Sequence, residues 1–297
     1  MRKIIWYILP CCFAAFNKIA AQDSMAVRMA NTVMTIWKDS LYTDPSKPAR
    51  WSYDQGVILK GMEGLWVQTG DPVYFRYMQQ SMDFFVDEKG QIRTYKASDQ
   101  NLDNLLCGNV LLRLYQVTGK HKYLAAAQQL YAQLQTQPRT PTGGFWHKKI
   151  YPNQMWLDGL YMAEPFYAMY SALFHVSANW KDIAYQFILA EQHTRDPESG
   201  LLYHAWDAAK EQAWADKQTG RSPHSWARAM GWYGLALTEV LEYFPEHLPE
   251  RDSLLAILQR YAATVAKYQQ SSGLWYDVLD MPREKGNYFE SSAACMF

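Results

Sequence analysis

The sequence predicts an all-α protein in which helical hairpins stack side by side as an α/α toroid. Helical periodicity dominates after residue 25, and no convincing pair of alternating strands is found. A glycine-aromatic segment recurs between helices, as GQIRTY from Gly90, GFWH from Gly144, GLLYH from Gly200 and GLWYD from Gly273. The number of residues between successive glycines is about that of a helical hairpin plus a loop. Successive hairpins should therefore stack side by side with their loops on one face.

The expected helices follow one another along the chain, each with an apolar face such as Val110, Leu111, Leu114 and Tyr115. They are expected at about residues 26–38, 54–68, 73–88, 103–118, 121–135, 158–174, 178–193, 226–244 and 251–270, with the start of a tenth within 288–297. Inner helices of the ring should begin in the segments that mix small and polar residues, which are NLDNLLCG, MWLDGLYM, SWARAMGW and YFESSAAC.

The mature chain is expected to be one domain, residues 22–297, because no Pro/Gly/Ser-rich linker divides it. A closed ring of six hairpins needs two helices for each hairpin, which is more than the roughly nine helices and partial tenth expected here. We therefore expect the ring to be truncated at its C-terminus.

The N-terminal segment MRKIIWYILPCCFAAFNKIAAQ has a basic start, an apolar stretch and small residues near Ala21. This order is typical of a secretory signal peptide, residues 1–21, which is too short to span a bilayer. The protein is therefore expected to be secreted or periplasmic. Lipid attachment at Cys11 or Cys12 is disfavoured because Pro10 is not the small residue that should precede such a site.

The composition excludes several classes of partner. Lysine plus arginine and aspartate plus glutamate each number 29, so no overall field attracts nucleic acid or an anionic membrane surface. Aromatic residues make up 15% of the chain, and their flat faces suit sugar rings. Cys107 and Cys295 form neither a C-x-x-C motif nor a Cys/His cluster, so we expect no disulfide framework, metal or organic cofactor.

Several polar or aromatic residues near the expected loops should converge if the loops share a face. They are Tyr53, Asp103, His147, Asp158, His204, Arg228 and Trp232. Two carboxylates and two histidines among them would line the mouth of a central pocket. Each residue also has a structural interpretation, because carboxylates favour helix N-termini, histidines often serve as buried hydrogen-bonding groups, and a tryptophan can simply be core.

Five segments carry a resemblance to a known family: WSYDQGVILKGMEGLW, NLDNLLCGNVLLRLYQVTGKHKY, GGFWHKKIYPNQMWLDGLYMAEPFYAMY, SGLLYHAWD and SPHSWARAMGWYGLALTEVL. The sequence resembles glycoside hydrolase family 105, the unsaturated rhamnogalacturonyl hydrolases, and more distantly family 88. This resemblance covers nearly all of residues 25–297, and its Trp-Leu-Asp and Trp-Ala-Arg-x-x-Gly-Trp motifs are specific. It implies an (α/α)6 barrel that removes a 4,5-unsaturated galacturonyl residue from the non-reducing end of rhamnogalacturonan (pectin) oligosaccharides.

The resemblance also assigns roles to individual residues. Asp158 matches the general acid/base, and Asp103 matches a second pocket carboxylate. The residues that match or support substrate contacts are Tyr53, His147, Lys148, His204, Arg228 and Trp232. Arg228 is expected to bind the uronate carboxylate through its guanidinium fork, helped by Lys148 or a histidine.

The implied chemistry requires a protonated Asp158, which donates its proton to C4 of the unsaturated uronate. A helix N-terminus favours the anion instead. Burial by Trp156 and Tyr161 and repulsion from Asp103 favour the acid, and Asp103 is therefore expected to raise the pKa of Asp158.

Three other activities fit the same residues. An unsaturated glucuronyl hydrolase would apply the same chemistry to glycosaminoglycan fragments. A conventional inverting glycosidase would use Asp103 and Asp158 as separate acid and base on saturated sugars. A non-catalytic sugar-binding toroid would use both carboxylates only to accept hydrogen bonds from hydroxyl groups.

Overall fold

The structure is a computed structural model that describes residues 24–38, 41, 46 and 49–297. The expected signal peptide, residues 1–21, lies outside the described residues, as do Cys11 and Cys12.

The described part of the chain is mainly helical, as expected. Its α-helices are α1 (Met25–Ile36), α2 (Tyr53–Thr69), α3 (Pro72–Phe85), α4 (Cys107–Thr118), α5 (His121–Thr136), α6 (Leu157–Leu173), α7 (Asn179–Thr194), α8 (Ala227–Tyr243), α9 (Glu250–Lys267) and α10 (Ser291–Met296). Two short 3-10 helices, η2 (Ala97–Asp99) and η3 (Leu102–Leu105), precede α4. The helix that was expected to begin near residue 103 therefore starts as a 3-10 turn, and its α-helical part begins later.

Local sequence explains where several helices begin and end. The Gln55 side chain accepts a hydrogen bond from the backbone N–H of Ser52 (2.7 Å) and closes the first turn of α2. Gly70 ends this helix with φ 69°, a left-handed conformation that glycine adopts without a steric cost. Asp71 then caps α3 through the N–H of Val73 (2.9 Å), and Pro72 occupies its first position.

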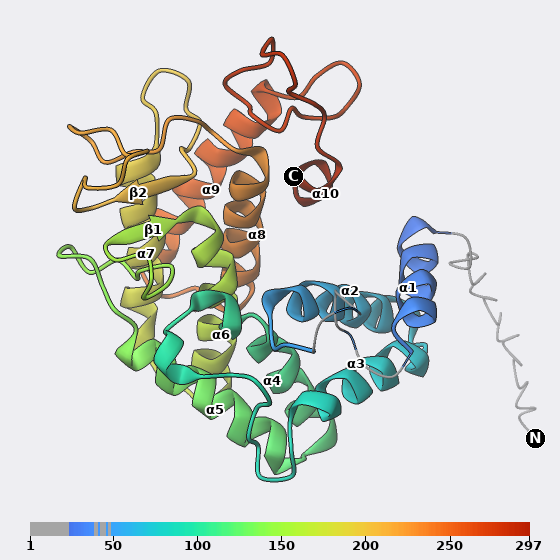
Figure 1. Cartoon of the computed structure of the whole chain (residues 1–297). Coiled ribbons are helices and arrows are strands. Elements are labelled where there is room, and N and C mark those ends of the chain that lie inside the picture. Colours follow the sequence, from blue (N-terminus) through green and yellow to red (C-terminus); the bar gives the residue numbers. More distant parts are fainter. Residues whose placement is uncertain (1–23, 39–40, 42–45, 47–48) are drawn as a thin grey trace, which may run out of the picture.

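The helices form hairpins around an inner row. Helices α2, α4, α6 and α8 contact one another in that order, and each packs against the helix that follows it in the sequence. The short α10 continues the row beside α8. Figure 1 shows these hairpins following an arc from α1, in blue, to α9 and α10, in red. The predicted stacking of hairpins is confirmed.

Glycines allow the inner helices to approach one another closely. A Cβ atom added at Gly108 of α4 would lie 2.4 Å from the Phe166 ring of α6. Likewise, a Cβ atom at Gly234 of α8 would lie 2.4 Å from the Tyr261 hydroxyl of α9. Since real Cβ atoms do not approach other heavy atoms this closely, a larger residue at either position would push two helices apart.

The glycine-aromatic segments form four similar turns. In each turn a glycine with positive φ donates its N–H to a carbonyl three or four residues earlier. The glycines and their acceptors are Gly90 and Asp87, Gly143 and Thr140, Gly200 and Asp196, and Gly273 and Gln270. The second repeat was expected to start at Gly144, but Gly143 is the residue with φ 95°.

Two strands were not expected. β1 (Gln154–Trp156) and β2 (Ala205–Asp207) form an antiparallel pair in which Trp156 lies opposite Ala205. Strands of three residues are too short for an alternating pattern to stand out from the surrounding loop. The pair ties the loop before α6 to the loop after α7.

Among the described residues, none of the helices is both long and apolar enough to cross a membrane.

Candidate active site

The loops gather at the N-terminal ends of the inner helices. The residue four positions after each left-handed glycine accepts a hydrogen bond, through its side-chain hydroxyl in one turn and its backbone carbonyl in the other three. The donor is a backbone N–H at the start of the inner helix that precedes the turn. The donors and acceptors are Trp51 and Thr94 Oγ1 (2.8 Å), Leu102 and the His147 carbonyl (3.0 Å), Leu157 and the His204 carbonyl (3.0 Å), and Ala227 and the Asp277 carbonyl (2.8 Å). The loops therefore share one face of the fold, as the repeat predicts.

Asp158 and His204 meet because of this arrangement. Asp158 directly follows Leu157, and His204 is the residue whose carbonyl accepts the Leu157 N–H. His204 Nε2 lies 3.1 Å from Asp158 Oδ2, and the Asp158 side chain is 15% exposed. Neither atom has an aligned hydrogen bond within the described residues. The contact is therefore a close electrostatic one, in which the N–H is not directed at the oxygen.

The pKa of Asp158 lies below its usual value. Burial is the largest influence and opposes ionisation, but contact with His204 and the charge of His147 together outweigh it. Asp158 also lies in the first turn of α6, where the helix dipole favours the anion. The sequence set the helix dipole against burial and Asp103, and in the free protein the balance favours the anion because of the contact with His204, which the sequence did not reveal.

Asp103 is held by two basic side chains. Its Oδ2 lies 2.6 Å from Lys148 Nζ, and its Oδ1 lies 3.3 Å from His147 Nε2. A β-bridge between Asn101 and Lys148 aligns the two segments, and the Asn101 side chain accepts the Asp103 N–H (3.1 Å). Lys148 offsets the charge of Asp103, and Asp103 is not among the main influences on the pKa of Asp158.

His147 lies between the two carboxylates and is only 3% exposed. Burial lowers the pKa of its imidazole, and the charges of Asp103 and Asp158 act in the opposite direction. Lys148 and His204 lower the pKa further. Since all four groups act on one imidazole, the predicted convergence of these residues is observed.

Tyr53 and Arg228 belong to the same group of residues. Burial raises the pKa of the Tyr53 phenol, and the Asp54 carboxylate adds to this effect. Asp103 and Asp158 also raise it, whereas Arg228 lowers it. Tyr53 remains 37% exposed, so the residue is partly open to solvent.

Arg228 and Trp232 have protein partners already. Arg228 Nη1 pairs with Glu290 Oε1, and the guanidinium lies 4.2 Å from the centre of the Trp226 ring. Trp232 stacks on Tyr161 with ring centres 4.8 Å apart, and it is only 7% exposed. Tyr161 thus covers one face of the Trp232 indole, and stacking of Trp232 on a sugar ring stays a prediction.

Three residues at the site were not among the predicted site residues: Trp156, Trp226 and Glu290. Trp156 stacks on His147 (4.7 Å between ring centres) and meets His204 edge-on (5.2 Å). Trp226 meets His204 edge-on from the other side (5.1 Å). All three residues directly precede an inner helix, namely α6, α8 and α10. This shared position is the signal that could have identified them.

The geometry suits proton transfer and the binding of an anionic, hydroxyl-rich ligand. The Asp158 carboxylate contacts the His204 imidazole, while the charge of Asp103 is offset by the Lys148 ammonium group. Within the described residues, no group of three His, Cys, Asp or Glu side chains could hold a metal ion.

Comparisons with known proteins place the chain in a family. The model of Glycosyl Hydrolase Family 88 matches residues 25–297. A solved family 105 glycoside hydrolase from C. acetobutylicum is 39% identical with a TM-score of 0.85, and the match covers 91% of this chain and 73% of that one. This similarity confirms the predicted helical toroid fold.

Two curated relatives are similar in sequence. Protein Atu3128 of Agrobacterium fabrum is 39% identical over 121 residues, which is 39% of this chain and 49% of the relative, so the match spans about half of that protein. The unsaturated rhamnogalacturonyl hydrolase YesR of Bacillus subtilis is 28% identical over 250 residues, which is 82% of this chain and 68% of the relative. The model of glycosyl hydrolase family 88 matches this chain from the first described helix to the last, so the chain belongs to that family.

Proposed function

We propose that the protein is a hydrolase that removes a 4,5-unsaturated galacturonyl residue from the non-reducing end of rhamnogalacturonan oligosaccharides. The observation that carries this proposal is the contact of Asp158 with His204 (3.1 Å), beside an Asp103 that Lys148 and His147 hold in place. The family and the named activity of the Bacillus subtilis relative support the choice of substrate.

The C4=C5 bond of such a sugar is an enol ether conjugated to the carboxylate on C5. Asp158 in its acid form donates a proton to C4, and the positive charge that develops at C5 is shared with the ring oxygen. Water then adds at C5 and returns a proton to the Asp158 carboxylate. The resulting hemiketal opens to a C5 ketone, and the hemiacetal left at C1 expels the remaining sugar. The glycosidic bond is not attacked directly, so neither anomer is excluded.

The proton on Asp158 has to be acquired as substrate binds, because the pKa of Asp158 is lowered by His204 and His147 in the free protein. The substrate brings its own carboxylate, and a second negative charge near Asp158 favours the acid form. Arg228 can bind this carboxylate but is already paired with Glu290. The uronate charge is therefore only partly neutralised, and its remaining charge raises the pKa of Asp158.

Asp103 suits binding better than independent acid/base catalysis. Both of its oxygens face basic groups, Lys148 at 2.6 Å and His147 at 3.3 Å. A carboxylate held in this way can accept hydrogen bonds from sugar hydroxyls. This arrangement disfavours the inverting glycosidase, in which Asp103 and Asp158 would act as separate acid and base.

The test follows the ultraviolet absorbance of the conjugated double bond, which disappears when water adds. The substrate is the unsaturated rhamnogalacturonan disaccharide. The native chain should consume it, and Asp158→Asn should lose at least roughly 10²- to 10⁴-fold in kcat. Asp83→Asn is the matched control, because Asp83 lies on the outer helix α3, where it pairs with Lys122 (2.9 Å), and its loss should leave kcat unchanged.

Other outcomes identify the alternatives. Faster turnover of an unsaturated chondroitin disaccharide would indicate a glucuronyl hydrolase. Hydrolysis of saturated oligosaccharides alone would indicate a conventional glycosidase. Binding without turnover of any uronide, unaffected by Asp158→Asn, would indicate a sugar-binding toroid.

A further inference from the structure

A small cavity lies behind the active-site imidazole of His147. Its volume is about 10 Å³, at the lower limit of the space that admits one water molecule. Most of its lining is apolar and includes Phe145 and Met155, while His147, Glu164 and Gln186 bring polar side chains to it. A cavity of this size and mixed lining can hold a single water molecule if two or more polar groups are free to bind it.

Glu164 is one such group. It lies on α6, the helix that also carries Asp158, and it is only 1% exposed. Its Oε2 has no hydrogen-bond partner within the described residues. Burial raises the pKa of Glu164 well above its usual value, and the Asp182 charge adds to this effect while Arg139 opposes it. Burial without a hydrogen-bonding partner on Oε2 thus favours the neutral acid, which has one O–H to donate.

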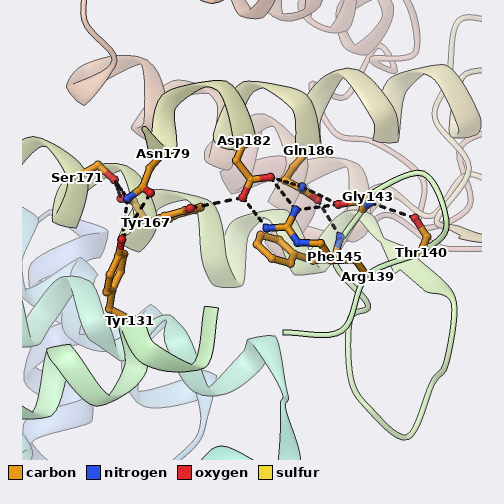
Figure 2. Close-up of polar contacts among 11 residues, drawn as sticks. Tyr131, Arg139, Thr140, Gly143, Phe145, Tyr167, Ser171, Asn179, Asp182 and Gln186 are labelled. Atoms are coloured by element: carbon orange, nitrogen blue, oxygen red, sulfur yellow. Dashed lines mark hydrogen bonds and ion pairs between the residues drawn. The ribbon is translucent and has the colours of Figure 1, made fainter. Parts of the chain in front are cut away.

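Gln186 does not meet this need, because its amide is already engaged. Its Oε1 accepts the Phe145 N–H (2.9 Å), and its Nε2 donates to the Gly143 carbonyl (3.2 Å) and to Asp182 Oδ1 (3.0 Å). Figure 2 shows this network, in which Arg139 in turn holds Asp182 with two hydrogen bonds (2.7 and 2.6 Å). Trp156 also lines the cavity, but its indole N–H already donates to Gln154 Oε1 (3.1 Å). His147 is therefore the remaining polar side chain that can bind a water molecule there.

The imidazole of His147 offers an acceptor to the cavity. Its Nε2 lies 3.3 Å from Asp103 Oδ1, and the negative charge of that carboxylate favours the tautomer with the proton on Nε2. Nδ1 is then a bare lone pair, and it has no partner within the described residues. Nδ1 faces α6, because a Cβ atom added at Gly159 would lie only 2.9 Å from it.

We propose that Glu164 is a positioning residue, whose carboxyl group donates to a water molecule in this cavity, which in turn donates to Nδ1 of His147. Each group in this hydrogen-bonded series has a suitable partner. The Glu164 O–H donates to the water, the water donates to Nδ1, and the Nε2–H of the same imidazole faces the Asp103 carboxylate. The arrangement satisfies two buried polar atoms that otherwise lack partners. It also fixes the orientation of the imidazole that lies between Asp103 and Asp158.

The test uses the full chain with ¹⁵N-labelled histidine, and a spectrum of His147→Gln identifies the His147 signals among those of the seven histidines. The native Nδ1 signal should have the shift of a hydrogen-bonded lone pair. Glu164→Met, which has a similar volume but no donor, should move it downfield to the free value. Glu164→Gln retains an N–H donor and should restore the native shift.

Ser171→Ala is the matched control. Ser171 is a buried polar residue of the same helix, and its hydroxyl donates to the Tyr167 carbonyl (2.6 Å) outside the cavity lining. Loss of this hydroxyl should lower stability without moving the His147 signals. A purely structural role for Glu164 would make the two variants alike.

The native spectra alone can overturn the proposal if Glu164→Met does not fold. A free lone pair at Nδ1, or a ¹³C shift of an ionised Glu164 carboxylate at pH 7, would each refute it. An unchanged Nδ1 shift in folded Glu164→Met would refute it as well.

The kinetic consequence rests on the proposed function, whereas the spectroscopic one does not. Glu164→Met should lose up to about 100-fold in kcat on the unsaturated disaccharide, because a small displacement of an active-site group has effects of this size, and Glu164→Gln should recover most of the loss. If the spectra agree but the native chain turns over no uronide, the proposed function fails and the role of Glu164 stands. Full activity in a Glu164→Met chain that has lost the native Nδ1 shift would show that the contact does not position His147 for catalysis.

Discussion

Replacing His204 by glutamine should destabilise the protein near neutral pH and have a smaller effect in acid. His204 Nε2 lies 3.1 Å from Asp158 Oδ2. Burial is the largest influence on Asp158, and contact with His204 is the main effect that opposes it and keeps the pKa of Asp158 low. Without His204, burial dominates, the pKa of Asp158 rises, and the buried anion loses its stabilising partner.

The size of the effect follows from the geometry. The contact is electrostatic and not an aligned hydrogen bond, so we expect it to contribute no more than the lower end of the range for hydrogen bonds to charged groups, about 1.5 kcal/mol. For a chain of this length each kcal/mol changes Tm by about 2–4 °C, so His204→Gln should lower Tm by about 3–6 °C.

The sign of the pH dependence follows from the lowered pKa of Asp158. A group whose folded pKa is depressed contributes its full stabilisation above the unfolded pKa, which is about 4 for aspartate. The contribution is lost as the pH falls through the folded pKa. The difference in Tm between native and variant chains should therefore be constant from about pH 6 to pH 5 and shrink below about pH 4.

Thermal unfolding of a double-mutant cycle isolates this contact. The cycle combines His204→Gln with Asp158→Asn, and the coupling energy should be about 1.5 kcal/mol at pH 6. His224→Gln is the control, since His224 contacts Asp280 at a similar distance (3.2 Å) but its side chain is 48% exposed, and exposed pairs contribute little. A coupling energy near zero at pH 6, or one that does not change with pH, would refute the account of Asp158.

Two further predictions concern substrate binding and helix packing. Lys148→Met removes the ammonium group 2.6 Å from Asp103, and it should raise KM about tenfold with a smaller change in kcat, as expected for the loss of one charge-assisted contact. Initial rates measure this, and an equal loss in kcat would instead place Lys148 in the chemistry. Gly108→Ala should lower the free energy of unfolding by about 1–3 kcal/mol, because its methyl group meets the Phe166 ring at 2.4 Å. Gly64→Ala, with nothing within 4 Å of the added methyl, should raise it by about 0.5–1 kcal/mol in the same urea titration; equal effects would contradict the packing argument.

The helices and turns were predictable because their signals are local and repeated. Apolar periodicity along Val110, Leu111 and Leu114 directly reflects the buried face of α4. The glycines of the turns were identified to within one residue, since only Gly143 replaces the expected Gly144. The strands β1 and β2 had no such signal, because three residues cannot show a period.

The site was predictable as a set of residues but not as a set of contacts. The family resemblance and the expectation of a shared loop face are enough to group Asp103 and Asp158 with the two histidines. The pairing of each carboxylate with one histidine, His147 or His204, depends on hydrogen bonds between loops, which leave no pattern in the sequence. The balance of burial and charge that lowers the pKa of Asp158 depends on those pairings, so its direction could not be predicted.

The repeat explains how one scaffold builds a site with different side chains. At each inner helix the backbone N–H of one residue binds the next turn, so the side chain that follows this residue is free to vary. Each repeat thus pairs one helix residue, the one after the N–H donor, with the turn residue that accepts the N–H. The pairs, with the helix residue first, are Ser52 and Thr94, Asp103 and His147, Asp158 and His204, and Arg228 and Asp277. Two consecutive repeats thus carry an acid at the helix start and a base on the turn, and their side chains touch.

The next repeat reverses these charges, with a base at the helix start and an acid on the turn. Its turn residue, Asp277, accepts the indole N–H of Trp226 (2.9 Å), the ring that meets His204 edge-on. Its helix residue, Arg228, remains beside the site with Glu290 as its partner. Because the Ala227 N–H binds a turn carbonyl as Leu102 and Leu157 do in the two preceding repeats, the reversal costs the scaffold no backbone contact. It adds a cation to the site, where Arg228 influences Tyr53 together with Asp103 and Asp158.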